Sequence, residues 1–195
     1  MIHATSHTHP IRVDFVPTDP LPGRLGLTLA PGKKATSSVS RVRWDRDLDT
    51  DLQDLRQRFG TDVLVSLMRP YEHDLLEIPD LFPRAEAHSM RVRPFPIDDV
   101  SVPDARSADA FGQLIDELHA ELEAGRTLTV HCRGGLGRSG LVAACLLVRA
   151  GLDAATAVRR VRKHRPGAIE TRGQEAYVGA YADWLTTAPG ATPET

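Results

Sequence analysis

Short runs of apolar residues alternate along the chain with longer amphipathic segments. The short runs are rich in Val, Leu and Ile and are bounded by Gly, Pro or Asp, a pattern that predicts β-strands. Strands are expected at 24–31, 62–68 and 127–131, and a weaker one at 89–97, where prolines interrupt the run. We expect 24–31 to be an edge strand or one arm of a hairpin.

Five segments carry apolar residues at the three- and four-residue spacing of a helix face. In the segment 47–60, for example, Leu48, Leu52 and Leu55 share one face. The segment 138–151 is apolar on nearly every side, which predicts a helix buried in the core. The remaining predicted helices are 104–125, 153–166 and 171–185.

Strands that alternate with helices predict crossover connections, and therefore an α/β fold with a central, mostly parallel sheet flanked by helices. In such sheets the loops that follow the strands gather at one edge, where ligands bind. Two loops with chemically active side chains belong to this edge. One carries Asp98, Asp99 and Asp104, and the other begins at Cys132.

The 195 residues suit a single domain, which we expect at 20–186. Residues 1–19 are expected to be a partly disordered extension and residues 187–195 a flexible tail, because both ends are small, polar and contain proline. The formal net charge of −2 gives no reason to expect nucleic acid or a membrane as a partner. Two cysteines are too few for a disulfide framework, which favours a reducing, cytoplasmic setting.

The stretch TVHCRGGLGRSG, residues 129–140, places a cysteine and a glycine-rich loop between a predicted strand and a predicted helix. Such a loop can turn its N–H groups inward to hold an anion, and the start of the helix adds its positive end. A thiolate at Cys132 would be stabilised there and would act as a nucleophile at neutral pH. The predicted anion-binding residues are Arg133, Gly134, Gly135, Leu136, Gly137 and Arg138.

Arg138 and Ser139 complete this chemistry. The planar guanidinium of Arg138 suits bidentate binding of a phosphate, and the Ser139 hydroxyl can donate a hydrogen bond to the sulfur when it leaves. The set predicts attack of Cys132 on phosphorus and hydrolysis of the resulting phosphocysteine. Taken singly, Cys132 also fits a buried cysteine, Arg138 a surface arginine and Ser139 a helix cap. Their combination between a strand and a helix favours catalysis.

The motif HCRGGLGRS, residues 131–139, resembles the His-Cys-(five residues)-Arg-Ser/Thr signature of the cysteine-dependent protein tyrosine and dual-specificity phosphatases. Its continuation HCRGGLGRSGLVAACLLV, together with GRLGLTLAPGKK, FPIDDVSVPD and GAIETRGQEAY, resembles the cyclin-dependent-kinase-associated phosphatase branch. The resemblance covers roughly residues 20 to 185. It implies a protein-tyrosine-phosphatase-like fold, phosphomonoester substrates, and a mechanism without metal or other cofactor.

The resemblance also implies a general acid on the neighbouring loop, at Asp99, which protonates the leaving oxygen. The family usually has an apolar or small residue before this acid, whereas this chain has Asp98. The choice between Asp98 and Asp99 therefore stays open. Asp104 fits better as the N-cap of the helix that follows.

Two further residues receive supporting roles from the resemblance. Gln174 matches the glutamine that positions the attacking water, and His131 matches the histidine that orients the loop from behind. Gln174 also has capping-box spacing with Thr171, so the sequence leaves both of its roles open. His131 equally fits a buried histidine with satisfied hydrogen bonds.

We therefore expect a phosphoprotein phosphatase, active on phosphotyrosine, with phosphoserine and phosphothreonine left open. Its partner is then a phosphorylated protein, and a kinase partner does not follow from the motif. The main alternative keeps the chemistry and changes the substrate to a phosphoinositide, an RNA 5′ phosphate or a small metabolite. An inactive phosphate-binding module is disfavoured because cysteine, arginine and acid are all present. The basic stretch 159–165 reads as a solvated helix face, and Arg133 is the better candidate for substrate contact.

Overall fold

A five-stranded sheet forms the centre of the computed structural model, which describes residues 2–37 and 41–187. Its strands are β2 (Asp14–Val16), β3 (Arg24–Thr28), β6 (Val63–Ser66), β7 (Arg91–Pro94) and β8 (Thr127–His131). Their order is β2-β3-β8-β6-β7. All neighbours are parallel except β2, which is antiparallel to β3. The predicted α/β fold with a mostly parallel sheet is confirmed.

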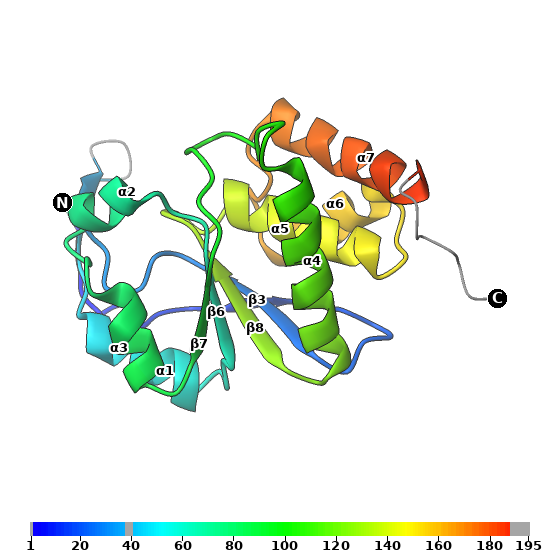
Figure 1. Ribbon diagram of the computed structural model, residues 1–195. Coiled ribbons are helices and arrows are strands. Elements are labelled where there is room, and N and C mark those ends of the chain that lie inside the picture. Colours follow the sequence, from blue (N-terminus) through cyan, green and yellow to red (C-terminus); the bar gives the residue numbers. More distant parts are fainter. Residues whose placement is uncertain (1, 38–40, 188–195) are drawn as a thin grey trace.

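Helices cover both faces of this sheet (Figure 1). They are α1 (Leu48–Gln57), α2 (Pro70–Leu75), α3 (Leu81–Ala87), α4 (Ala108–Glu123), α5 (Gly137–Arg149), α6 (Ala154–His164) and α7 (Arg172–Thr187). Val63 and Val65 of β6 pack into a core shared with α4 to α7, whereas Leu64 packs on the opposite side with residues of α1 and α3. Among the described residues, no helix is long and apolar enough to cross a membrane.

The long helix predictions are confirmed within a few residues at their ends. The clearest case is α5, in which every residue from Gly137 to Val148 is buried. It packs against β3, β8, α4, α6 and α7. An apolar surface on all sides is what such a central position requires.

The N-terminal residues differ from the expected loose extension. β1 (Ile2–Ala4) pairs with β5 (Val42–Asp45), and β2 covers the outer edge of β3. β3 is therefore an interior strand and the arm of a hairpin, not an edge strand, and four of its five residues are buried. Strands of three residues are too short to show a period of two, so β1 and β2 could not be predicted from the sequence pattern. The tail that was expected to be flexible lies outside the described residues from position 188 onward.

A second, three-stranded sheet has the order β1-β5-β4, with β4 (Lys34–Ser37) antiparallel to β5. The sequence predicted neither β4 nor β5. Both strands have only four residues, too few to establish a period of two. β4 (KATS) also has a single apolar residue, whereas β5 (VRWD) does alternate.

A buried ion pair ties this second sheet to α1. Arg46 donates from Nε and Nη2 to both carboxylate oxygens of Asp51, at 2.7 and 2.8 Å. Asp51 also accepts from the amide of Gly32, and Arg46 donates to the carbonyl of His9. Both side chains are excluded from solvent, so each charge depends on these partners.

We predict that Asp51→Ala lowers the free energy of unfolding by about 3–5 kcal/mol, because it leaves the buried Arg46 charge without a counter-ion. Denaturant unfolding followed by circular dichroism measures this. The control is Asp54→Ala, which removes a carboxylate of the same helix from an ion pair with the half-exposed Arg58 and should cost less than about 1 kcal/mol. Equal losses in the two variants would contradict a special role of the buried pair.

Candidate active site

The carboxyl ends of the parallel strands bring the sequence-predicted loops to one edge of the sheet. The loop 132–136 follows β8 and leads into α5, and the loop that carries Asp98 and Asp99 follows β7. The segment after β6 leads into α2, which had not been predicted. The structure therefore joins three chain segments at this edge, one more than the sequence indicated.

Cys132 lies at the base of its loop with only 3% of its surface exposed. The amide of Gly135 donates to Cys132 Sγ at 3.3 Å, and Ser139 Oγ lies 3.7 Å from the same sulfur. The sulfur also faces the first turn of α5, whose amide groups carry the positive end of the helix dipole. The sulfur therefore lies among hydrogen-bond donors at the start of a helix.

Close packing requires a glycine at position 135 of the loop, and Gly137, the first residue of α5, also lies close to its neighbours, which there are flexible side chains. Gly135 has a φ of +70°, and a Cβ atom there would collide with the carbonyl of Thr28 at the end of β3. A Cβ atom at Gly137 would collide with the carboxylate of Glu170. Gly135 thus allows the loop to fold directly over the sheet edge.

Three successive carbonyls of the loop accept hydrogen bonds from cationic side chains on its outer side. Arg165 donates to the carbonyls of Gly135 (3.0 Å) and Gly134 (3.3 Å), and Lys33 Nζ donates to that of Arg133 (3.2 Å). Because C=O and N–H point in opposite directions across a trans peptide, these contacts turn the next N–H groups toward Cys132. Burial lowers the pKa of Lys33, and the charge of Arg133 adds to this.

Arg138 is buried and forms a bidentate ion pair with Glu72 of α2. Its Nη1 and Nη2 donate to the two carboxylate oxygens at 2.7 and 2.8 Å. Nη1 also donates to the carbonyls of Leu67 and Ile97. Burial acts to raise the pKa of Glu72, but hydrogen bonds from Arg138 and from the Arg69 amide outweigh it and lower this pKa. Among the described residues Arg138 Nε has no partner, which leaves it available to an anion.

The adjacent aspartates make different contacts. Asp99 Oδ1 lies 2.9 Å from Arg138 Nη2, with 45% of its side chain exposed. Asp98 Oδ1 instead accepts a hydrogen bond from Arg69 Nε at 2.8 Å. Asp104 accepts from the amide of Ser107, so it caps the turn before α4, whose own N-cap is Ser107.

Gln174 is buried and joins α7 to the loop that carries the aspartates. Its Nε2 donates to the carbonyl of Ser101 at 3.1 Å. The capping box expected with Thr171 is present, because each residue's side chain accepts from the other's amide. Gln174 also lies directly beside Gly137, where an added Cβ would come within 2.9 Å of its Nε2.

His131 is fully buried at the end of β8, and neither ring nitrogen has a hydrogen-bond partner among the described residues. This differs from the expected histidine with satisfied hydrogen bonds. Burial, helped by the neighbouring His73, lowers the pKa of His131 to about 3, so the ring is neutral. The side chain therefore supports the loop by its packed volume and not by a charge.

Sequence reasoning missed Glu72, Arg69 and Arg165. Glu72 lies in the polar string RPYEHD, which no apolar period marks as a helix. Arg165 is one of several cations at 159–165, so charge alone did not distinguish it. The signal that was present is its place at the end of α6, directly before Pro166 and Gly167, where the chain turns back toward the loop.

Comparisons with known proteins show what the whole chain is similar to. A family described as a Swiss Army Knife protein, DSP-PTPase phosphatase domain, matches residues 45–178. Cyclin-dependent kinase inhibitor 3 of Rattus norvegicus is 33% identical over 164 residues, which cover 83% of this chain and 73% of that protein. A crystal structure of kinase associated phosphatase with its catalytic-site cysteine changed to serine superposes with a TM-score of 0.79 at 28% identity, covering 92% and 98% of the two chains. PTPMT1 in complex with PI(5)P, at 14% identity and a TM-score of 0.66 over 83% and 92% of the chains, shares the fold.

We predict that His131 makes the fold less stable as the pH falls below about 6.5. An unfolded histidine binds a proton with a pKa near 6.5, whereas the buried ring does so only near 3. The unfolding free energy should therefore fall by about 1.4 kcal/mol per pH unit through this residue, and recover as the pH rises.

Urea unfolding at pH 7, 6 and 5 tests this. In His131→Asn the unfolding free energy should fall with decreasing pH by about 1.4 kcal/mol per pH unit less than in the wild type. In His7→Asn, whose side chain is exposed, its dependence on pH should match that of the wild type. Parallel slopes for wild type and His131→Asn would refute the assignment.

Proposed function

Because the chain belongs to the DSP-PTPase phosphatase family, and is therefore a cysteine-dependent phosphatase, we propose that it dephosphorylates proteins with Cys132 as the nucleophile. The observation that carries the assignment of residues is that Cys132, Arg138 and Asp99, from two loops and the start of α5, lie together at one edge of the sheet. The protein substrate is supported by the relatives, one of which is named a kinase associated phosphatase. That name describes the relative, and we extend its class of substrate to this chain by analogy.

In the first step the Cys132 thiolate attacks phosphorus. The S–P bond forms as the P–O bond to the leaving group breaks. The loop N–H groups and Arg138, through its free Nε, hold the other three oxygens. Asp99 gives its proton to the leaving oxygen.

In the second step water attacks the phosphocysteine and the S–P bond breaks. Asp99, now a carboxylate, accepts the proton from this water, so that the acid of the first step is the base of the second. Ser139 donates a hydrogen bond to the departing sulfur, for which its 3.7 Å distance is suitable after a small shift. Gln174 positions the water, since it lies beside the loop at Gly137.

The contacts of the two aspartates support Asp99 over Asp98 as the acid. Asp99 is held beside Arg138, the residue that binds the phosphoryl group, whereas Asp98 is engaged by Arg69 outside the loop. When a phosphate binds to Arg138, it competes for the guanidinium and releases the Asp99 carboxyl toward the leaving oxygen. Asp98 has no such route.

A phosphoinositide or small phosphate ester is less well supported. The loop between Cys132 and Arg138 contains no lysine, whereas phosphoinositide phosphatases of this superfamily usually carry lysines there. The similarity to PTPMT1, at 14% identity, concerns the fold alone. Hydrolysis of aryl phosphate without hydrolysis of any phosphopeptide would favour this alternative.

We predict that Cys132→Ser abolishes phosphate release from matched phosphotyrosyl and phosphothreonyl peptides. The serine hydroxyl stays protonated and has no adjacent base, so the loss should exceed about 10³-fold. Phosphopeptide binding, measured by calorimetry, should remain, because the loop amides and Arg138 are unchanged. Turnover in this variant near that of the wild type would exclude the phosphocysteine mechanism.

We predict that Asp99→Asn lowers kcat/KM about 10²- to 10³-fold for a phosphothreonyl peptide, whose alkoxide leaving group needs a proton. The loss should be much smaller for p-nitrophenyl phosphate, whose leaving group departs without one. Asp98→Asn is the matched neighbour and should change neither substrate by more than a few-fold. A larger, leaving-group-dependent loss in Asp98→Asn would reverse the assignment.

A further inference from the structure

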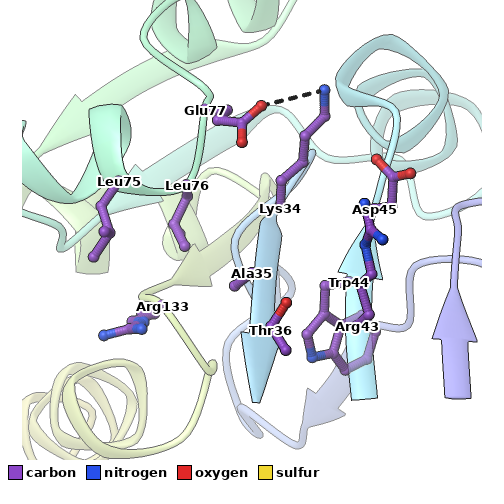
Figure 2. A pocket seen from close by; sticks show the side chains of 10 residues that line it. All are labelled: Lys34, Ala35, Thr36, Arg43, Trp44, Asp45, Leu75, Leu76, Glu77 and Arg133. Atoms are coloured by element: carbon purple, nitrogen blue, oxygen red, sulfur yellow. Dashed lines mark ion pairs between the residues drawn. The ribbon is translucent and has the colours of Figure 1, made fainter. Parts of the chain in front are cut away.

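A groove of about 480 Å³ runs along β4, with residues of β5 on one side and the C-terminal end of α2 beyond the outer edge of β4 on the other (Figure 2). We call it the β4 groove. It reaches the proposed active site, because Arg133, the residue that follows Cys132, forms part of its wall. Figure 2 shows β4 facing Leu75, Leu76 and Arg133 across it. Its lining residues are Lys34, Ala35, Thr36, Arg43, Trp44, Asp45, Leu75, Leu76, Glu77 and Arg133.

The backbone of β4 is a free strand edge on the side of this groove. β4 is the outermost strand of the β1-β5-β4 sheet. In an antiparallel pair, alternate residues turn their N–H and C=O groups away from the partner strand. Lys34 is one of these, since its amide donates to the carbonyl of Leu76 instead of to β5. Thr36, two residues further on, therefore turns its N–H and C=O outward too, and no described residue outside the sheet hydrogen-bonds to them.

The charges of the groove favour an acidic ligand. Its two carboxylates are already engaged, Glu77 with Lys34 at 3.8 Å and Asp45 with His3 at 3.3 Å. The guanidinium groups of Arg43 and Arg133 form no ion pair with any described residue. Two arginines thus remain to bind carboxylates or a second phosphate. The net charge of the whole chain is −2, so this local excess of positive charge is not a property of the surface at large.

The opposite wall offers an apolar contact. Leu75 lines the groove with 57% of its surface exposed, and Tyr71, one turn earlier on α2, is 59% exposed. An extended peptide that pairs with β4 would direct alternate side chains toward this wall and away from it.

We propose that the β4 groove binds the substrate itself: an extended, acidic segment next to the phosphorylated residue adds to β4 as a further strand. Backbone hydrogen bonds to Thr36 and the carbonyl of Lys34 hold it, and Arg133 and Arg43 select its acidic side chains. The inference rests on the proposed protein substrate. It makes the enzyme selective for unfolded or loop segments, because a helix presents no free backbone groups to β4.

The test uses an acidic phosphopeptide of about twelve residues and p-nitrophenyl phosphate with the full-length enzyme. Thr36→Pro removes the outward N–H and breaks no hydrogen bond between β4 and β5, because this N–H points away from β5. Thr36→Val keeps the N–H and removes only the side-chain hydroxyl. We expect Thr36→Pro to raise KM for the peptide about 3- to 10-fold, the effect of one hydrogen bond. Its kcat, and both constants for p-nitrophenyl phosphate, should stay at the wild-type values, as should all constants of Thr36→Val.

A second measurement needs no enzyme variant. Single N-methyl groups are placed at successive amides of the peptide, each of which removes one backbone donor. Strand addition requires KM to rise at every second position only. Replacing the glutamates of the peptide by glutamine should also raise KM about 3- to 10-fold.

The outcomes separate the two proposals. Peptide hydrolysis with no effect of Thr36→Pro and no alternation along the N-methyl series overturns the β4 docking site and leaves the phosphoprotein function intact. Hydrolysis of p-nitrophenyl phosphate without hydrolysis of any peptide overturns both.

Discussion

The buried pair between Arg138 and Glu72 is the interaction on which the geometry of the site depends. Removing a guanidinium from water costs several kcal/mol unless its N–H groups are all satisfied. Arg138 meets most of this need through its two Nη groups, which donate to Glu72 and to the carbonyls of Leu67 and Ile97, in three different segments. Only its Nε lacks a partner among the described residues. The end of β6, the start of α2 and the loop after β7 are thereby fixed to the first turn of α5.

The loop around Cys132 is ordered by contacts on its outer side as much as by its own glycines. Arg165 and Lys33 bind the carbonyls of residues 133 to 135, and the opposite ends of those peptides then face the sulfur. Gly135 shows the result directly, because its amide donates to Cys132 Sγ. An anion site of this kind is prepared before any ligand arrives, so little reorganisation is needed in the reaction.

The sequence contained the central elements of the fold and the core of the site. The strands at 62–68 and 127–131, the buried helix after Gly137 and the Cys132–Ser139 loop all follow from local patterns. Glu72 and Arg165 did not, because their roles come from partners 66 and 30 positions away, which spacing along the chain does not reveal. The family resemblance favoured Asp99 over the adjacent Asp98 but left the choice open, and their separate contacts with Arg138 and Arg69 support Asp99.

The support of the loop extends further along the chain than the signature does. Arg165 is held in place by Asp14 of β2, at 2.6 Å and 151 positions earlier, and Lys33 also precedes the span 45–178 that the family shares. A polypeptide trimmed to that span would keep Cys132, Arg138 and Asp99. It would lose Asp14, the counter-ion of Arg165, and it would lose Lys33 altogether. The contacts that order the catalytic loop therefore extend beyond the segment by which the family is recognised.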